Sequence, residues 1–473
     1  MINPFDIDQL LRWVAGGYTQ ALRYRCDRAE WQPGQRLKLL LTGYNGARNT
    51  GADVRVAEII RQLHHLLGRD KVDLTVTTLN PQLTMGYFQG AQQVRLPHVF
   101  PQFLYNECPQ HHGVIACEGS MFKSKFADAL STMMAMSLGL AATENKLSVG
   151  YGAEAGAMNN RLSQFVQHHC RDSLILCRNR PSQRLLSEKL GIRSTGGTDT
   201  AWTFEPAPLG HGAALLKRAG WDGRCPVLAI CPINPFWWPV KPSMEKWLGN
   251  HLAGLYREQH YCSLYFHHQS QVANQKYSNY IKGLAQAVNT FCQQREIFPI
   301  VVGMEQIDRQ ACKDLAAALD QNVPYFISDQ HNMYSLVSLL RNCDLLVSSR
   351  FHAILTTMPA QVPAVGVTMD ERIRNLMHEQ GHHELLLDVD DPNLGEKLLP
   401  LLHRLEQDRD TVAHKIGQTV ADQLQHMGHM GIAFMAEVSR IYPDFPQPQR
   451  SPTWETHLPP LSPTLTHLLE NYA

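Results

Sequence analysis

The residues best suited to chemistry follow a short apolar run near position 345. The run Leu345–Ser348 leads directly into Ser349, Arg350, Phe351 and His352. A guanidinium can hold a carboxylate or a phosphate through two hydrogen bonds, and an imidazole can transfer a proton near neutral pH. An ion pair for Arg350 and a helix-capping role for His352 are the structural alternatives, and we favour a functional role for the two residues together.

A glycine-rich loop is a second candidate site. Residues 43–53 read Gly-Tyr-Asn-Gly-Ala-Arg-Asn-Thr-Gly-Ala-Asp, between an apolar run and a helical pattern. Glycine lets a backbone approach a ligand closely, and a helix N-terminus favours an anion. The spacing fits neither the dinucleotide-binding nor the P-loop pattern, so a tight turn capped by Asn49 or Asp53 is an equally open interpretation. The candidate binding residues of this loop are Gly43, Asn45, Gly46 and Asn49.

Other polar and charged side chains also follow apolar runs. In the first half of the chain these are Glu118, Ser120, Lys123 and Arg178. In the second half, a turn with Asp370, Glu371, Arg372 and Arg374 follows residues 364–367. Glu371 and Arg374 are expected in a solvated helix start, whereas binding and structural roles are equally open for Asp370 and Arg372.

The elements that must position these residues alternate between strand and helix. Strands are predicted at residues 37–42, 72–77, 113–117, 146–150 and 173–177, and again at 226–231, 263–267, 299–303, 345–348 and 364–367. Apolar residues at helical spacing predict helices at 53–67, 277–295, 308–320 and 333–341. A strand–helix–strand order requires parallel strands, so the fold class is α/β with two successive parallel-sheet domains. Ligands of such folds bind beyond the carboxyl ends of the strands.

Length and composition suggest the domain boundaries. A chain of 473 residues is too long for a single hydrophobic core. We predict an N-terminal helical arm at 1–30, a first Rossmann-like domain at 31–208 and a second at 222–400. C-terminal helices are predicted at 401–441, and a proline-rich tail at 442–473 is expected to be extended or ordered only against the body. Residues 205–211 form the expected linker.

The composition also limits the partners. Lys+Arg and Asp+Glu number 43 each, so no global field favours nucleic acid, and an anionic ligand needs a local cluster of cations. The eleven cysteines form no C-x-x-C pair and are expected to be reduced core residues. The adjacent histidine pairs have no metal-binding spacing, so no metal is expected. No signal-peptide pattern and no bilayer-length apolar run is found, so a cytoplasmic protein is expected.

In their order along residues 37–390, these motifs resemble those of the polysaccharide pyruvyl transferase family. The loop 43–53 is similar to the family's opening G-Y-x-G-x-x-N-x-G-D-E, and residues 118–122 resemble its second, glycine-rich turn. Arg178, Ser182 and residues 199–204 resemble an R-x-x-x-S…D-x-x-F stretch, and residues 302–308 a V-G-M-x-x-x-D strand end. The firmest similarity is that of residues 349–372 to S-R-x-H-A…V-P…D-x-K/R. In the first loop, the acidic residue Asp53 is displaced by one position from the family pattern. The second turn reads Glu-Gly-Ser instead of a run of glycines.

The resemblance implies a glycosyltransferase-B-like (GT-B-like) arrangement, with the acceptor in the first domain and the donor in the second. It implies transfer of a pyruvyl group from phosphoenolpyruvate to two sugar hydroxyls, forming a ketal in surface-polysaccharide biosynthesis, with no other cofactor. Arg350, Arg178 and Arg372 would hold the donor, His352 would donate a proton, and Asp308 or Glu118 would deprotonate a hydroxyl. Lys123, Asp370, Ser349, Ser120 and the loop residues would complete substrate binding. The acceptor would be a sugar or a lipid-linked saccharide, which leaves peripheral membrane contact and a homo-oligomer open.

Two other functions remain open from the sequence. A glycosyltransferase with a nucleotide-sugar donor would have the same two domains, with the glycine-rich loop at a diphosphate. A homologue without catalysis that serves as a binding protein is compatible with the altered turns, although Arg350 and His352 argue against it.

Overall fold

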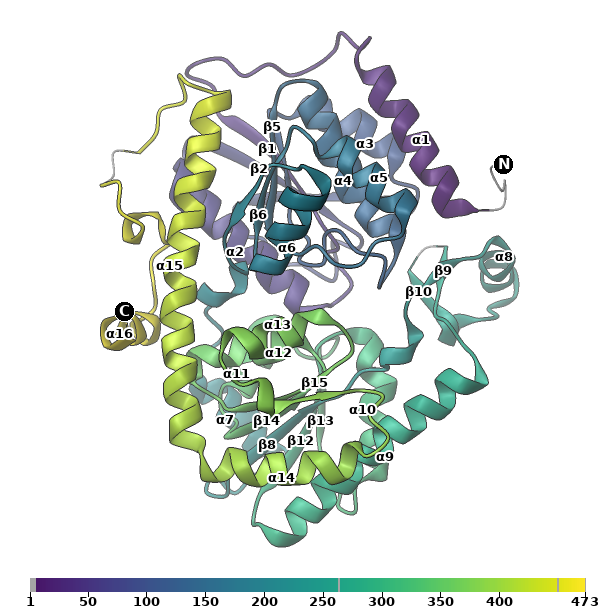
Figure 1. Ribbon diagram of the computed structural model, residues 1–473, viewed down its shortest axis with the longest axis vertical. Coiled ribbons are helices and arrows are strands. Elements are labelled where there is room, and N and C mark those ends of the chain that lie inside the picture. Colours follow the sequence, from purple (N-terminus) through teal and green to yellow (C-terminus); the bar gives the residue numbers. More distant parts are fainter. Residues whose placement is uncertain (1–5, 263, 449–450, 473) are drawn as a thin grey trace.

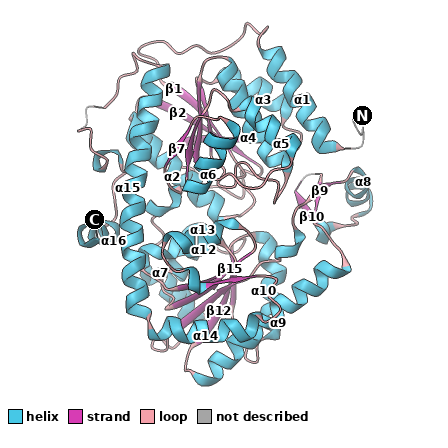
Figure 2. Ribbon diagram, in the orientation of Figure 1, coloured by secondary structure: helices cyan, strands magenta, loops and turns pink. Residues whose placement is uncertain are grey.

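Two parallel β-sheets form the centres of two α/β domains in the computed structural model, which describes residues 6–262, 264–448 and 451–472. Helices cover both faces of each sheet (Figure 2). The central strands of both sheets are buried along nearly their whole length, as expected for parallel strands covered on two sides. The predicted fold class is confirmed.

The first domain has the strand order β3-β2-β1-β4-β5-β6-β7. The strands are β1 (Leu37–Thr42), β2 (Val72–Thr78), β3 (Ala91–Arg95), β4 (Gly113–Ala116), β5 (Leu147–Ala153), β6 (Leu174–Cys177) and β7 (Ser194–Gly196). The helices are α2 (Thr50–Leu67), α3 (Pro101–Glu107), α4 (Asp128–Thr143), α5 (Asn160–His169) and α6 (Arg180–Arg184). A 3₁₀ turn, η3 (Thr200–Thr203), follows β7.

The second domain has the strand order β13-β12-β8-β14-β15-β16. The strands are β8 (Val227–Cys231), β12 (Phe298–Gly303), β13 (Tyr325–Ile327), β14 (Leu345–Ser348), β15 (Ala364–Thr368) and β16 (Leu386–Asp388). The helices are α7 (Leu209–Arg218), α9 (Gln271–Gln294), α10 (Arg309–Ala318), α11 (Met333–Leu340), α12 (Phe351–Thr357), α13 (Glu371–Glu379) and α14 (Leu394–Gln407). The expected linker at 205–211 is shorter in the structure because α7 begins at Leu209, and the boundary expected at residue 400 falls inside α14.

An insertion at residues 232–270 separates β8 from α9. It contains β9 (Lys241–Pro242), α8 (Met244–Ala253), β10 (His260–Cys262) and β11 (Tyr265–Phe266), and its strands form an antiparallel sheet. The strand predicted at 263–267 therefore does not join the parallel sheet, and residue 263 lies outside the described residues. The insertion also contacts the first domain, since the amide of Val240 donates to the carbonyl of Phe126 at 2.9 Å.

Helices at both chain ends pack on this two-domain body. The amphipathic α1 (Ile7–Leu22) lies on α3 and α4. Helix α15 (Arg409–Ile441) runs along both domains (Figure 1) and packs on α2 and β5 as well as on α14. The tail, which we predict to be extended or ordered only against the body, ends in a further helix, α16 (Pro463–Tyr472), which packs on α15. In the described part of the chain, no helix has the length and apolar character needed to cross a membrane.

Candidate active site

The N-terminal turn of α2 is the point where the glycine-rich loop meets the second domain. Asn49 caps the helix and accepts a hydrogen bond from the amide of Ala52 at 3.2 Å, while the amide of Thr50 donates to the carbonyl of Met304 at 2.8 Å. Gly51 lies directly against His352, because a Cβ atom placed on Gly51 would come within 2.1 Å of the His352 Nδ1. The loop and the histidine predicted separately from the sequence are therefore in contact.

His352 is positioned by a carboxylate of the first domain. Its Nε2 lies 3.5 Å from the Oδ2 of Asp199, and its side chain keeps 16% of its surface exposed. Burial lowers the pKa of His352, and the charge of Asp199 partly opposes this effect. The imidazole is therefore neutral near pH 7 in the ligand-free protein and needs an added negative charge nearby to become a proton donor.

Asp199 is held by two arginines as well. Its Oδ2 lies 3.2 Å from the Nε of Arg55 and 3.0 Å from Nη1 of Arg178. Burial alone would raise the pKa of Asp199, but the charges of Arg55, His352 and Arg178 outweigh it and hold the pKa well below its usual range. Asp199 is thus a permanent negative charge behind His352.

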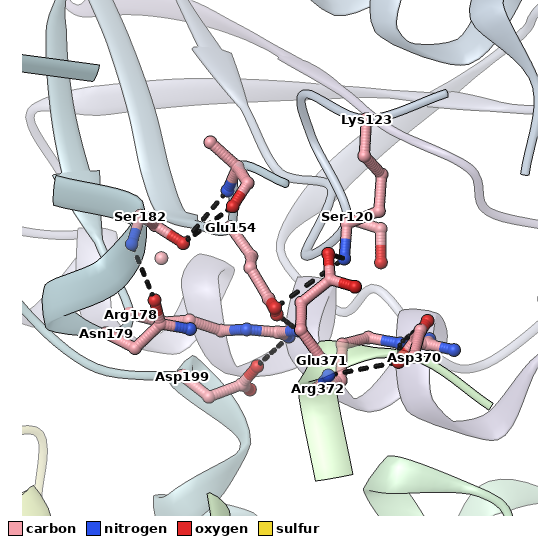
Figure 3. Close-up of polar contacts among 12 residues, drawn as sticks. Ser120, Lys123, Glu154, Arg178, Asn179, Ser182, Asp199, Asp370, Glu371 and Arg372 are labelled. Carbon is pink, nitrogen blue, oxygen red and sulfur yellow. Dashed lines mark hydrogen bonds and ion pairs between the residues drawn. The ribbon is translucent and has the colours of Figure 1, made fainter. Parts of the chain in front are cut away.

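Arg178 and Lys123 belong to one buried ion-pair network between the domains (Figure 3). Arg178 binds Glu154 as well as Asp199, and the Nζ of Lys123 lies 3.5 Å from Glu154 and 2.8 Å from Glu371 of α13. Burial lowers the pKa of Lys123 to about 8 and that of Arg178 to about 10. Glu371, which was expected to be solvated, instead joins the second domain to the first through Lys123.

Arg372 and Asp370 bind each other at the start of α13. The Arg372 Nε lies 2.8 Å from the Oδ2 of Asp370, and its guanidinium packs on the ring of Phe126 at 4.5 Å. Burial alone would raise the pKa of Asp370, but the charges of Arg372 and Lys123 lower it. An anionic donor would have to compete with these carboxylates for Lys123, Arg178 and Arg372.

Arg350 also has carboxylate partners. Its guanidinium binds Asp308 through Nε at 2.9 Å and through Nη2, and its Nη1 lies 3.0 Å from the Oε2 of Glu305. Burial raises the pKa values of both carboxyls, that of Glu305 to about 7, although Arg350 and, for Glu305, Asn49 act in the opposite direction. Asp308 is completely buried and also accepts from the amide of Glu305 at 3.0 Å, so its geometry is that of a residue that positions Arg350.

The remaining predicted residues lie at strand ends around this centre. Asn45 donates to the carbonyl of Thr77 at 3.1 Å, and the amide of Gly43 donates to the Thr77 hydroxyl at 3.3 Å. Gly46 has a φ of 83° and lies so close to Asn80 that a Cβ would not fit. In the second turn the amide of Ser120 donates to Glu118 at 3.2 Å, and in the second domain the Ser349 hydroxyl bonds Tyr280 at 2.8 Å.

A cleft of about 1110 Å³ opens beside this centre. One side is formed by the first-domain loops at Tyr44–Ala47 and 79–83, and the other by residues 305–310 and the insertion. Glu305 contributes to the cleft lining and binds Arg350 behind it. Glu305 thus contacts both the cleft and Arg350. Among the described residues, no His, Cys, Asp and Glu side chains are grouped in a way that could hold a metal ion.

The sequence interpretation did not single out three residues of this centre as site residues. Asp199 lies in a stretch that resembles the family, but nothing in the sequence connects it with His352. Glu305 follows a predicted strand by two positions, and this position was a usable signal. Arg55 lies in a helical pattern, where an arginine usually indicates a solvated face, so the sequence carries no signal for its burial against Asp199.

Comparison with known proteins agrees with the sequence resemblance. Residues 159–371 match the family model described as polysaccharide pyruvyl transferase. No curated protein sequence matches the chain. HepE from Anabaena, solved in complex with UDP, has a similar structure with a TM-score of 0.52 at 12% identity, covering 85% of this chain and 100% of HepE. A putative UDP-N-acetylglucosamine 2-epimerase from Listeria monocytogenes is also similar, with a TM-score of 0.52 at 11% identity. The likeness covers 88% of this chain and 99% of that protein. The GT-B-like arrangement is confirmed by these likenesses.

Proposed function

Because residues 159–371 match the polysaccharide pyruvyl transferases, we propose that the protein transfers a pyruvyl group from phosphoenolpyruvate to two hydroxyls of a saccharide. The observation that carries this proposal is the placement of His352 between the α2 N-terminus and Asp199, with Arg350 two residues before it at the end of β14. This arrangement offers a proton donor and an anion-binding arginine at the junction of two domains.

The proposed reaction begins with protonation of the enol methylene by His352. A phosphate and a carboxylate next to the imidazole raise its pKa, which supplies the charged form that the ligand-free site lacks. Protonation of the methylene carbon gives the central carbon oxocarbenium character, and a first sugar hydroxyl attacks that carbon and loses its proton. A second hydroxyl then attacks the same carbon as the C–O bond to phosphate breaks, and its proton passes to the departing phosphate. The products are the ketal and hydrogen phosphate, and the proton lost by the first hydroxyl replaces the one that His352 gave to the methylene carbon.

The chain's own residues divide these tasks. Asp199 keeps the imidazole oriented and stabilises its protonated form, with Arg55 as the counter-charge behind it. Arg350 is the cation closest in sequence to His352, and Asp308 holds its guanidinium in place. Glu305 lines the cleft, and burial raises its pKa to about 7, so we assign it the removal of the hydroxyl proton. Glu118, the alternative base at the second turn, stays a candidate.

The cations around Glu154 suggest how the donor is admitted. Lys123 of the first domain is paired with Glu371 of the second and with Glu154 of its own domain, so a relative movement of the domains would remove one of its two carboxylate partners and open its ammonium group to the donor. Arg178 and Arg372 keep carboxylate partners within their own domains, and we propose that they act mainly by fixing Asp199 and Asp370.

The test is release of phosphate from phosphoenolpyruvate in the presence of a panel of sugar acceptors. We expect acceptor-dependent release that falls at least about 100-fold in His352→Ala, because a lost general acid typically costs that much or more. The matched control is His383→Ala, since His383 is an exposed histidine outside the site. Undiminished release by the His352 variant would remove His352 from the mechanism.

A nucleotide-sugar donor is the competing function, favoured by the UDP named in the HepE complex. The two are separated by the melting temperature of the protein with each ligand, because a ligand that binds only the folded state raises it. A shift with UDP-glucose and none with phosphoenolpyruvate, together with no phosphate release, would exclude the pyruvyl transferase proposal.

A further inference from the structure

We infer that the cleft between the first-domain loops and the insertion binds the acceptor saccharide, with a sugar ring against Trp237 and Tyr261 and its hydroxyls on His267 and Glu305. The role of this saccharide as the acceptor rests on the proposed function. The binding of a saccharide in the cleft rests on the residues of the cleft alone. It also places part of the acceptor site in the second domain, although the family resemblance implies the first.

Aromatic side chains form the wall of the cleft on the side of the insertion. The ring of Trp237 stacks on His267 with centroids 4.2 Å apart, and Tyr261 stacks parallel to Tyr44 of the glycine-rich loop with centroids 5.8 Å apart. All four residues line the cleft, and Trp237, Tyr44 and Tyr261 are only half-buried. Flat, rigid aromatic faces beside polar groups suit a saccharide, because one face of a sugar ring is apolar and its rim carries hydroxyls.

Two buried polar side chains of the lining have unused hydrogen-bonding capacity. Neither ring nitrogen of His267 has a hydrogen bond of good geometry, although the backbone of Glu258 lies near the ring, and His267 is only 4% exposed. The Oε1 of Glu305 also lacks a hydrogen bond of good geometry, although the Asn49 side chain and the Asp308 amide lie near the carboxylate, and its Oε2 faces Arg350. Buried polar groups without partners are costly, so a ligand that supplies hydroxyls would gain free energy here.

Glu305 connects the cleft to the proposed chemistry. Its carboxylate is shared between the cleft lining and Arg350, and Arg350 lies two residues before His352. A saccharide hydroxyl bound to the Oε1 of Glu305 would therefore contact the carboxylate that we assign to remove its proton. Since burial keeps the pKa of Glu305 at about 7, this carboxylate can take up that proton near neutral pH.

The charges of the lining favour a saccharide over a nucleoside diphosphate. Arg309 of the lining is paired with Asp329, and Glu305 is already paired with Arg350, so Glu258 offsets only one of the two other arginines, Arg95 and Arg257. A diphosphate needs a surplus of cations or several free backbone amides. The described lining residues therefore keep an excess of one arginine charge, which is too little for a diphosphate, so a largely uncharged, hydroxyl-rich ligand fits better.

The experiment measures saccharide binding without phosphoenolpyruvate, by saturation-transfer NMR with lactose, cellobiose and N-acetyllactosamine. The variants are Trp237→Ala and His267→Gln, and the matched control is Trp13→Ala, which removes a 71% exposed tryptophan from α1. We expect both cleft variants to bind at least tenfold more weakly than the wild type and Trp13→Ala, with melting temperatures within a few degrees.

Unchanged binding in both cleft variants would overturn the inference, and so would absence of binding by all three saccharides or their displacement by UDP. In the transfer assay, the same variants should raise the KM for the acceptor and leave the KM for phosphoenolpyruvate unchanged. If the variants lose saccharide binding while the wild type releases no phosphate with any acceptor, the proposed reaction fails and the saccharide site stands.

Discussion

At the scale of single residues, the close approach of Gly51 to His352 is the most demanding contact of the site. The position tolerates no side chain, because a Cβ would lie 2.1 Å from Nδ1 and 2.5 Å from Cγ of the imidazole. The backbone of Gly51 is ordinary helix, so the requirement comes from space and not from a special conformation. The glycine of the loop is thus explained by its neighbour in the other domain.

Replacement of Gly51 by alanine tests this contact. We expect Gly51→Ala to lower phosphate release at least tenfold and the free energy of unfolding by about 1–3 kcal/mol, because the imidazole must move to make room. The control is Gly210→Ala, which is also the second residue of a helix and has open space around it. That variant should keep full activity and gain about 0.5–1 kcal/mol from the better helix former. Equal activity of the two variants would contradict the account.

The sequence predicted the residues of the site better than their partners. Arg350 and His352 could be identified because they directly follow an apolar run, which places them at the functional edge of a parallel sheet. Their partners Asp199 and Asp308 come from distant segments, and no local pattern encodes a pairing across a sheet or between domains. The main difference concerns two arginines that are expected to hold the donor. In the structure, Arg178 and Arg350 are both paired with carboxylates.

At the scale of elements, the first turn of α2 is the place where the first domain contacts the second domain at the site. Asn49 caps this helix and also contacts Glu305, which contributes to lowering the pKa of that carboxyl. The cap therefore has a structural effect on the helix and an electrostatic effect on the cleft. These two effects can be separated with a second capping asparagine.

We expect Asn49→Ala and Asn332→Ala to lose similar stability, about 1 kcal/mol each, because both asparagines cap helices through their side chains. Only Asn49→Ala should change the pH profile of transfer. Loss of the Asn49 contact raises the pKa of Glu305, so activity that depends on the carboxylate should rise at a higher pH than in the wild type. Stability is measured by urea unfolding and activity by phosphate release across pH, and an identical profile in both variants would exclude the role of Glu305.

Two elements show why local patterns are insufficient. Residues 263–267 have the apolar character of a core strand, but Tyr265–Phe266 pair antiparallel inside the insertion, because pairing partners are decided by the tertiary fold. The tail is rich in proline, yet Pro463 is the first residue of α16, a position where the missing amide costs nothing. The proline content of the tail therefore does not reveal this helix, which is ordered against the body.

At the scale of the whole molecule, buried histidines make stability depend on pH. Burial lowers the pKa values of His112, His169 and His267 to about 4, from an ordinary value of 6.5. The unfolded chain therefore binds more protons than the folded protein between these values. The stabilisation is complete above the unfolded pKa and is lost as the pH falls toward 4.

We expect each of these histidines to contribute a loss of roughly 1 kcal/mol to the free energy of unfolding between pH 7 and pH 5, allowing for partial solvent screening. The buried carboxyls of Asp53, Glu305 and Glu379 contribute in the opposite direction, because burial raises their pKa values to about 8, 7 and 7. The measurement is urea unfolding at both pH values. Relative to the wild type, His169→Gln should remove a loss of roughly 1 kcal/mol between pH 7 and pH 5, and this residue lies on α5, outside the cleft. The same pH dependence of stability in His169→Gln and in the wild type would contradict the assignment of His169 as neutral in the folded protein.

The course of α15 has a mechanical consequence for the cleft. The chain passes between the domains at residues 204–208 and again along this helix, and Figure 1 places α15 at the edge of the molecule opposite the insertion. These connections form a hinge between the two domains. When two rigid domains rotate about a hinge, displacement grows with distance from the hinge axis, so the cleft wall that contains Trp237 and Tyr261 would move furthest. A saccharide bound at this distance from the hinge would be the most effective in stabilising a closed arrangement of the domains around a second, smaller substrate.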